Sequence, residues 1–400
     1  MLRHLAPTGS PIKFLELLLW LKKTLTGGGD VEQLQRAVQA RLGNKYSYVY
    51  STGRGAMASL LSGVKALRSS TDVRDEVILP AYTCYSVASS VINAGLKIRL
   101  CDIEPTTLSY DLEQLKQIDF KNVLAIVSSN LYGLPNNNLV EVERLANEQG
   151  LFLVDDAAQS LNSKLAGRAV GTFGSAGILS LDKGKNVTSI QGGLVVTDNR
   201  ELSDYLVDQS RELPALGLKA SLIEFIKVLI YYAFLNPYAY KIPANISFSG
   251  LGETKYEPDL ELRQYPVFLS SLAESQLKRI DEITQKRVVH GEYYEKNLLL
   301  SDGVTKVERA ESSQPVYLRY PLLVHDTQRR ARLLEQHREY GISASYPASL
   351  NNLPEIESSL VEKRDCPGAD VVAKSIVTLP THAFVRGEDM RRIVEIVNSI

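Results

Sequence analysis

Short apolar segments alternate with amphipathic segments over the first part of the chain, and this alternation restricts the fold more than any other feature. Short strands joined by helices are typical of a mainly parallel sheet that is covered by helices on both faces. The sequence therefore predicts an α/β fold. The predicted strands are residues 47–51, 77–80, 98–101, 123–127, 151–154, 176–179 and 193–197, and the predicted helices are 56–67, 85–94, 112–118 and 139–149.

The organisation changes beyond about Leu251, which predicts a second, smaller domain. A chain of 400 residues exceeds one typical core. We predict a large three-layer domain over residues 1–250 and a smaller α+β domain over residues 251–400. The elements predicted for the smaller domain are a long helix over 269–298, strands over 317–324 and 376–379, and helices over 327–339 and 390–400.

Composition excludes several classes of function. The formal net charge is -1, which gives no basic footprint for nucleic acid. Cys84, Cys101 and Cys366 lie far apart without CxxC spacing, so neither a disulfide framework nor a zinc site is indicated. We predict no metal, no nucleic-acid partner and a location in the reducing cytoplasm.

Two apolar segments need a separate interpretation. Phe14 to Leu21 is interrupted by Glu16 and followed by lysines, which makes a poor signal peptide. Leu222 to Leu235 falls short of the roughly 20 residues that span a bilayer. We expect both segments to pack against the domain or a partner subunit rather than to contact a membrane, and we predict no transmembrane helix.

Gly53 and Arg54 lie in a turn between a predicted strand and a predicted helix. The first N–H groups of a helix are unpaired and its dipole favours an anion, so such a turn can hold a phosphate. The alternative interpretation is a tight turn without a ligand.

Asp156 follows directly after the buried strand 151–154. A half-buried carboxylate is costly unless a cation or hydrogen-bond donors pair with it. One interpretation is that Asp156 holds the protonated pyridine nitrogen of pyridoxal phosphate (PLP), with Gln159 near the ring hydroxyl. The alternatives are a helix N-cap for Asp156 and a surface position for Gln159.

The turn between the apolar segments 176–179 and 193–197 carries a hydroxyl, Ser180, and two amines, Lys183 and Lys185. A lysine at such a place can form a Schiff base with a carbonyl when burial leaves its amine neutral. The alternative is a solvated basic turn.

These residues, taken in order, resemble the DegT-type sugar aminotransferases, which are PLP enzymes of the aspartate-aminotransferase fold. The resemblance runs from about Tyr50 to the C-terminus, apart from a divergent stretch near 210–265. The matching motifs are Pro80-Ala81-Tyr82-Thr83, Tyr132-Gly133-Leu134-Pro135, Asp156-Ala157-Ala158-Gln159, Gly171, Gly174, Ser180, Lys185-Asn186-Val187-Thr188, Gly192-Gly193, Leu272-Ala273-Glu274-Ser275-Gln276-Leu277 and Leu379-Pro380-Thr381-His382.

The resemblance implies a role for each site residue. Lys185, which precedes Asn186 as in the family pattern, is implied to be the Schiff-base lysine and proton carrier, ahead of Lys183. Asp156 is implied to pair with the pyridine nitrogen and Gln159 to approach the ring hydroxyl. Ser180 and the backbone at Gly53 and Arg54 are implied to bind the phosphate.

Several positions depart from the family pattern. Arg54 replaces a usual threonine, so it either grips the phosphate or points elsewhere. Cys84 stands where an aromatic residue usually stacks on the cofactor, so either its thiol or neighbouring Tyr85 takes that place. Asn130 replaces a frequent histidine and Gln191 a frequent glutamate. The asparagine-tyrosine-arginine motif that the family extends across its dimer is not recognisable between Leu251 and Phe268.

The resemblance implies transfer of an amino group from an amino acid, glutamate by analogy, to a keto sugar that is nucleotide-linked, in bacterial polysaccharide or glycan biosynthesis. A homodimer is implied, because residues of both subunits complete each site in the family. Two alternatives stay open. One is a PLP-dependent sugar dehydratase, a branch that carries histidine at the position of Lys185. The other is a non-catalytic relative that acts as a regulatory or assembly partner.

Overall fold

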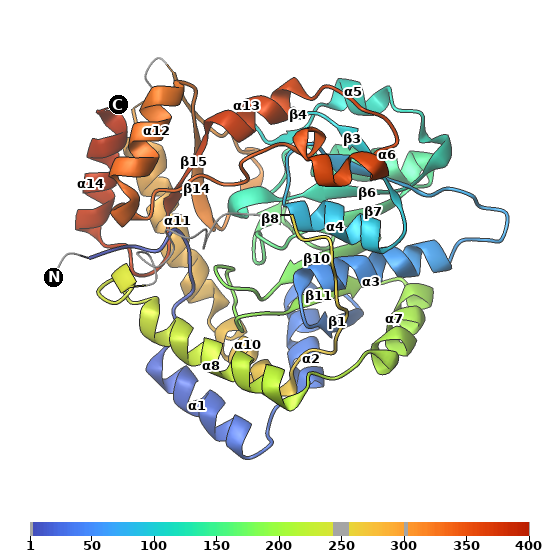
Figure 1. Cartoon of the computed structure of the whole chain (residues 1–400), viewed down its shortest axis with the longest axis horizontal. Coiled ribbons are helices and arrows are strands. Elements are labelled where there is room, and N and C mark those ends of the chain that lie inside the picture. The colour runs from blue at the N-terminus through green and yellow to red at the C-terminus, as the bar shows by residue number, and fades with distance from the viewer. Residues whose placement is uncertain (1–2, 243–255, 300–302, 400) are drawn as a thin grey trace.

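A seven-stranded sheet forms the centre of the computed structural model, which describes residues 3–242, 256–299 and 303–399 (Figure 1). The strand order is β1-β11-β10-β7-β6-β2-β3, and only β11 runs antiparallel to its two neighbours. The predicted mainly parallel sheet is thus confirmed. The strands are β1 (Tyr46–Tyr50), β2 (Glu76–Pro80), β3 (Lys97–Cys101), β6 (Val123–Ser129), β7 (Phe152–Asp156), β10 (Ala176–Ser180) and β11 (Gly193–Thr197).

Helices cover both faces of this sheet and give the three predicted layers. Side chains alternate along each strand, so that Val154 packs on one face and Leu153 on the other. One face is covered by α3 (Gly53–Ala66), α4 (Tyr85–Asn93) and α7 (Arg200–Glu212). The other is covered by α2 (Val31–Leu42), α5 (Leu112–Lys116), α6 (Leu139–Gln149) and α10 (Ser270–Leu277).

A second, antiparallel sheet of three strands forms the C-terminal part (Figure 1). Its strands, in the order β12-β14-β15, are β12 (Val304–Lys306), β14 (Arg319–Val324) and β15 (Ile376–Pro380). The helices of this part are α11 (Ile280–Asn297), α12 (Thr327–Gln336), α13 (Pro367–Ser375) and α14 (Gly387–Asn398).

Two small sheets complete the strand pairing. The first is a two-stranded hairpin of β4 (Ile103–Glu104) and β5 (Ser109–Tyr110). In the second, β8 (Lys164–Leu165) pairs with β9 (Arg168–Ala169) and with β13 (Ser313–Gln314).

The predicted domain boundary at residue 250 lies outside the described residues and stays a prediction. The N-terminal segment nevertheless contacts the C-terminal part, because Leu5 N–H donates to Glu339 O at 2.8 Å. His382 Nε2 lies 2.8 Å from Ala6 O, and the His382 side chain is buried there.

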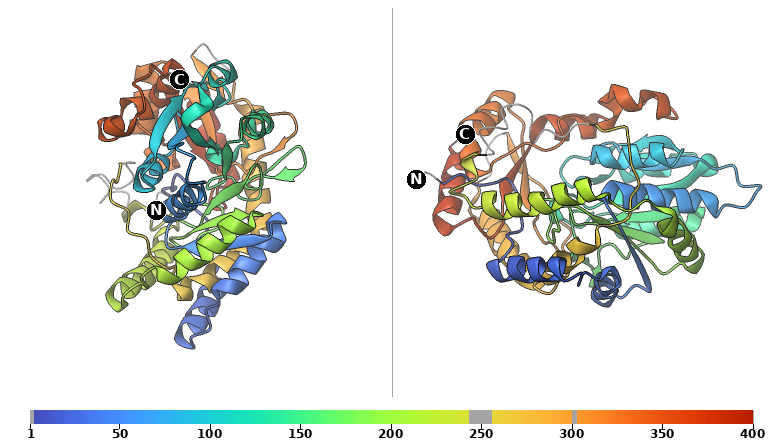
Figure 2. Two further views of the ribbon diagram at one scale, coloured as in Figure 1. Left: turned by 90° about the vertical axis from the view of Figure 1, so that its right-hand side faces the viewer. Right: turned by 60° about the horizontal axis from the view of Figure 1, so that its bottom comes forward.

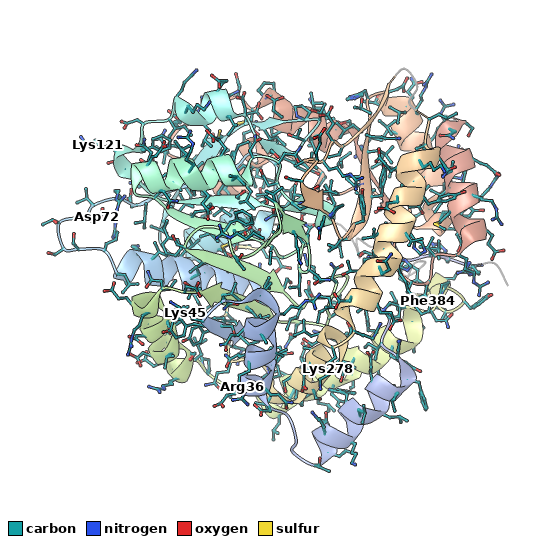
Figure 3. All side chains as sticks on the ribbon, turned by 180° about the vertical axis from the view of Figure 1, so that it is seen from behind. Arg36, Lys45, Asp72, Lys121, Lys278 and Phe384 are labelled. Atoms are coloured by element: carbon teal, nitrogen blue, oxygen red, sulfur yellow. The ribbon has the colours of Figure 1, made fainter. Side chains whose placement is uncertain are left out.

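The long helix predicted over residues 269–298 is divided into α10 and α11. Arg279 has non-helical dihedral angles, and its N–H reaches only three residues back, to Gln276 O at 3.1 Å. Its side chain leaves the helix line to bond Glu16 and Pro11 O. Lys278, at this break, lies at one end of the long α11 rod (Figure 3). The predicted single helix is thus broken at a residue whose side chain contacts the N-terminal segment.

Several predicted boundaries extend too far, and three of them have a visible end. The strand predicted from residue 317 begins at Arg319, because Tyr317 has a positive φ of 43°. The helix predicted over residues 112–118 ends at Lys116. The helix predicted over residues 327–339 ends at Gln336 and continues as a short 3-10 turn at Arg338–Tyr340.

The two apolar segments form α1 (Phe14–Leu25) and α8 (Leu218–Phe234), which lie side by side along one border of the molecule (Figures 1 and 2). Trp20 of α1 and Phe225 of α8 pack with ring centroids 4.9 Å apart. The outer sides remain apolar and exposed, as at Leu15 and Leu222. Among the described residues, no helix is long and apolar enough to cross a membrane. Packing of these outer sides against a partner subunit stays a prediction.

Trp20→Ala is expected to lower the free energy of unfolding by about 3–5 kcal/mol, because it removes a large buried side chain and leaves a cavity. Trp20 is fully buried, and its Nε1 donates to Phe268 O at 2.9 Å. Leu25→Ala is the control, since Leu25 is 83% exposed and should change stability by less than about 0.5 kcal/mol. Urea unfolding measures both, and equal effects would contradict the assigned burial.

Candidate functional site

A cavity of about 460 Å³ opens at the carboxyl edge of the central sheet. It is bounded by the ends of β1, β7 and β10, the following turns, and α8. The structure brings every predicted site residue to its wall, and their individual roles stay predictions. These residues are Gly53, Arg54, Cys84, Asp156, Gln159, Ser180 and Lys185.

The first turn of α3 forms one end of the cavity. Thr52 caps the helix and accepts the Gly55 N–H at 2.9 Å, so the N–H groups of Gly53 and Arg54 are left for another acceptor. A Cβ on Gly53 would lie 3.3 Å from the Ser180 hydroxyl, and one on Gly193 would lie 2.3 Å from the Gly53 Cα. Glycine at both places therefore keeps the helix terminus close to Ser180. This arrangement suits an anion.

Arg54 does not extend freely into the cavity. Its guanidinium donates to the Glu257 carboxylate at 2.6 Å and to the Glu257 carbonyl at 3.2 Å. The side chain is thus paired with Glu257, and a contact of its guanidinium with a phosphate stays a prediction. The backbone N–H of Arg54 is the donor that stays available at the helix terminus.

Asp155 and Asp156 end β7 with their side chains on opposite faces of the sheet. Asp156 lines the cavity, and its carboxylate accepts the Ala158 N–H at 3.0 Å. Burial raises the pKa of Asp156, while the Ala158 hydrogen bond and the charge of Lys185 act in the opposite direction. A cation placed against this carboxylate would therefore be stabilised, and would itself favour the charged form.

Asp155 has a structural role that sequence analysis did not foresee. Its carboxylate accepts hydrogen bonds from Asn130 Nδ2 at 2.8 Å, from Gly171 N–H at 2.6 Å and from Phe173 N–H at 3.1 Å. Burial raises the pKa of Asp155 to about 7 despite these donors. Asn130, which replaces the frequent histidine, also donates to Asp156 O at 2.9 Å and so joins the two strand ends.

The turn that carries Lys185 is fixed by the N-terminal segment. Ser10 Oγ donates to Lys185 O and Asn186 O, both at 2.8 Å, and Thr8 Oγ1 donates to Gly184 O at 2.8 Å. Both lysines line the cavity, where Lys185 is half-buried and Lys183 is exposed. Lys183 is therefore the more solvated of the two amines.

Ile190 closes the same turn in an unusual conformation. Its φ is 78°, a left-handed value that costs a β-branched residue energy. Its N–H is held by the Thr188 hydroxyl at 2.9 Å, and its side chain lines the cavity. The surrounding contacts thus impose strain beside the predicted reactive lysine.

Gln159 is held from both ends of its amide group. Its carbonyl accepts the Tyr132 N–H at 2.8 Å, and its amide nitrogen donates to the Tyr346 hydroxyl at 2.8 Å. It is therefore not a free surface side chain. One amide hydrogen remains for a ligand in the cavity.

Cys84 lines the cavity at the position of the missing aromatic residue. The Tyr85 hydroxyl instead accepts the Ala348 N–H at 2.8 Å and donates to the Ala348 carbonyl at 2.9 Å. Tyr85 is buried and does not line the cavity, whereas its neighbours Cys84 and Ser86 do. Which side chain lies against a cofactor ring stays a prediction.

Glu224, Lys227 and Glu257 also line the cavity, and sequence analysis missed them. All three come from the divergent stretch near 210–265, where no motif marked them. The only available signal was indirect: Glu224 and Lys227 are charged residues within an otherwise apolar segment.

The sequence was compared with a family model and with known proteins. The sequence model of the DegT/DnrJ/EryC1/StrS aminotransferase family matches residues 15–221 and 267–398. A GDP-4-keto-6-deoxy-D-mannose 3-dehydratase of Yersinia pseudotuberculosis is 30% identical over 183 residues, or 46% of each chain. The chain thus spans about half the length of this relative. A pleiotropic regulatory protein of Geobacillus stearothermophilus is 25% identical over 326 residues, 80% of this chain and 77% of that protein.

Among solved structures, PseC of Helicobacter pylori is described as an aminotransferase involved in the biosynthesis of pseudoaminic acid. It superposes with a TM-score of 0.79 at 19% identity, with 99% of each chain covered. At this identity the likeness shows a shared fold.

The pKa of Asp155 predicts a pH dependence of stability. Because this pKa is about 7 in the folded chain and near 4 when unfolded, the native state binds the extra proton between these values, so stability falls as pH rises through this window. Asp155→Asn should weaken the dependence of the melting temperature on pH between about pH 4 and pH 7. Thermal melts at several pH values measure this slope.

Asp72→Asn is the control for this prediction. Asp72 lies in a surface loop (Figure 3), and hydrogen bonding to Arg74 lowers its pKa to about 2, below the window. Its variant should keep the slope of the original protein. Equal slopes for all three proteins would contradict the assignment of the proton to Asp155.

Proposed function

Because the chain belongs to the DegT/DnrJ/EryC1/StrS aminotransferase family, we propose that it is a PLP-dependent aminotransferase. The proposed reaction moves an amino group from an amino acid, glutamate by analogy, to a nucleotide-linked keto sugar in bacterial polysaccharide or glycan biosynthesis. The observation that carries this proposal is the meeting of the Lys185 amine and the buried Asp156 carboxylate on the wall of one cavity.

The residues at the cavity wall fit PLP. The α3 terminus at Gly53 and the Ser180 hydroxyl offer donors to a phosphate. Asp156 is a buried carboxylate with one hydrogen bond from the described residues, at Ala158, so it has capacity to accept a proton-bearing nitrogen. When bound, PLP supplies an electron sink for carbanion chemistry.

Each protein group has a defined task in this proposal. Asp156 would keep a proton on the pyridine nitrogen, because its buried negative charge favours the cationic ring. Lys185 would hold the cofactor through its amine and then carry a proton to and from the donor's α-carbon. Gln159 would orient the ring with its remaining amide hydrogen. The turn fixed by Ser10 would keep Lys185 in place for both tasks.

Two alternatives have support among the relatives. The Yersinia protein is named a dehydratase, a branch in which histidine is expected where this chain has Lys185. The Geobacillus protein is named a regulatory protein. Retention of Lys185, Asp156 and Gln159 in one cavity favours the aminotransferase over both.

We further propose a cytoplasmic homodimer. The three cysteines are free thiols, which suits a reducing compartment. The exposed apolar sides of α1 and α8 are surfaces that a second subunit could cover. Light scattering should give twice the mass of the 44.3 kDa chain, and a monomeric mass would contradict the proposed dimer.

Lys185→Ala is expected to slow the reaction with the amino donor by about 10²- to 10⁴-fold, because it removes the proton carrier. The measurement is the change in visible absorption of the PLP-loaded protein when glutamate is added. Lys183→Ala is the matched control and should keep this response, since Lys183 is the exposed amine of the same turn.

Other outcomes of this experiment separate the alternatives. A PLP spectrum that is indifferent to every amino donor would favour the dehydratase. A protein that takes up no PLP would favour the regulatory relative. Loss of the response in Lys183→Ala but not in Lys185→Ala would exchange the roles of the two lysines.

A further inference from the structure

Helix α8 forms part of the cavity wall through Glu224 and Lys227. The family model matches residues up to 221 and resumes at 267, so both side chains come from a stretch that lies outside the shared sequence pattern. They share a cavity with Asp156 and Lys185, which lie within the matched residues. This chain thus adds polar groups of its own to a site that also contains residues of the family pattern.

The position of α8 is fixed against the lysine turn. Val228 and Tyr231 follow Glu224 at helical spacing and share its inward side. Val228 is fully buried. Ser10 N–H donates to the Tyr231 hydroxyl at 3.0 Å, and the Ser10 hydroxyl bonds Lys185 O at 2.8 Å. One short chain of contacts therefore joins Glu224's helix to the turn that carries Lys185.

The Glu224 carboxylate can accept more hydrogen bonds than it does. The residue is 8% exposed, and its Oε1 accepts Lys227 Nζ at 2.7 Å. Its Oε2 is fully buried and has no hydrogen-bond partner among the described residues. A buried acceptor without a donor is costly, and in native proteins it usually has a partner. Glu224 lines the cavity, so a rotation of its carboxyl group would bring this oxygen to a hydrogen-bond donor of a bound ligand.

We propose that Glu224 and Lys227 form the subsite for ring hydroxyl groups of the acceptor sugar, an inference that rests on the proposed aminotransferase function. A carboxylate only accepts and an ammonium only donates, so the pair suits hydroxyl groups, which do both. Because Lys227 neutralises Glu224, the pair has no net charge that would select the carboxylates of the amino donor or the diphosphate of a nucleotide. The sugar ring is thus the part of the substrates that this subsite recognises.

The test compares nucleoside-diphosphate hexoses with the free nucleotides. Isothermal titration would use UDP-glucose, GDP-mannose and dTDP-glucose against UDP, GDP and dTDP, with the PLP-loaded protein. We expect tighter binding of at least one sugar nucleotide than of its nucleotide. In Glu224→Ala this preference should fall by about 10- to 100-fold, because a hydrogen bond to a charged group is lost.

Glu212→Ala is the matched control, since Glu212 is an exposed carboxylate at the end of α7. It should keep the preference of the original protein. An undiminished preference in Glu224→Ala would overturn the subsite, as would equal binding of every sugar nucleotide and its nucleotide by the original protein.

The response of the cofactor spectrum to glutamate separates this proposal from the proposed function. Glu224→Ala should keep that response within about twofold, because the donor half of the reaction does not use the subsite. A lost response in Glu224→Ala alone would assign Glu224 to the amino donor and overturn the proposal. A missing response in the original protein would refute the aminotransferase, while the titration would still decide the sugar subsite.

Discussion

The parallel arrangement of six strands determines where the chemistry of this protein can lie. β1, β2, β3, β6, β7 and β10 run in one direction, so the residues that follow them meet at a single edge of the sheet. Gly53, Cys84, Asn130, Asp156 and Ser180 are separated by long stretches of sequence and still line one cavity. These residues come from different loops, and the sheet brings those loops together.

The two-residue period of a strand divides two neighbouring carboxylates between two tasks. Asp156 shares its side of β7 with the cavity. Asp155 faces the other layer, where it ties Asn130 to the segment at Gly171 and Phe173. A one-residue shift in the pairing of β7 would exchange these environments. The buried network of Asp155 therefore helps to fix the register that presents Asp156 to the site.

Local patterns predicted most of the fold, because strand and helix periodicity reflect which face of an element is buried. The strand that precedes Asp156 and the helix that follows Gly53 were foreseen in this way. Patterns could not predict the break at Arg279, which depends on a contact with Glu16 more than 250 residues away. Of the site, the family motifs identified Asp156 and Lys185, whereas Glu224 followed no motif. Its place in the cavity depends on how α8 docks, which is a tertiary contact.

The stretch near 210–265 adjusts the charge of the cavity, including the helix terminus that is expected to hold the phosphate of the cofactor. Among the described lining residues, four are basic and four are acidic. Two of the acids, Glu257 and Glu224, come from this stretch and pair with Arg54 and Lys227. An unpaired Arg54 beside the helix terminus would strengthen attraction for any anion, and pairing it with Glu257 moderates that field. Variation in this stretch can thus change the charge at the helix terminus through Glu257 and the charge beside α8 through Glu224. The basic residues of the lining are Arg54, Lys183, Lys185 and Lys227, and the acidic ones are Asp156, Asp182, Glu224 and Glu257.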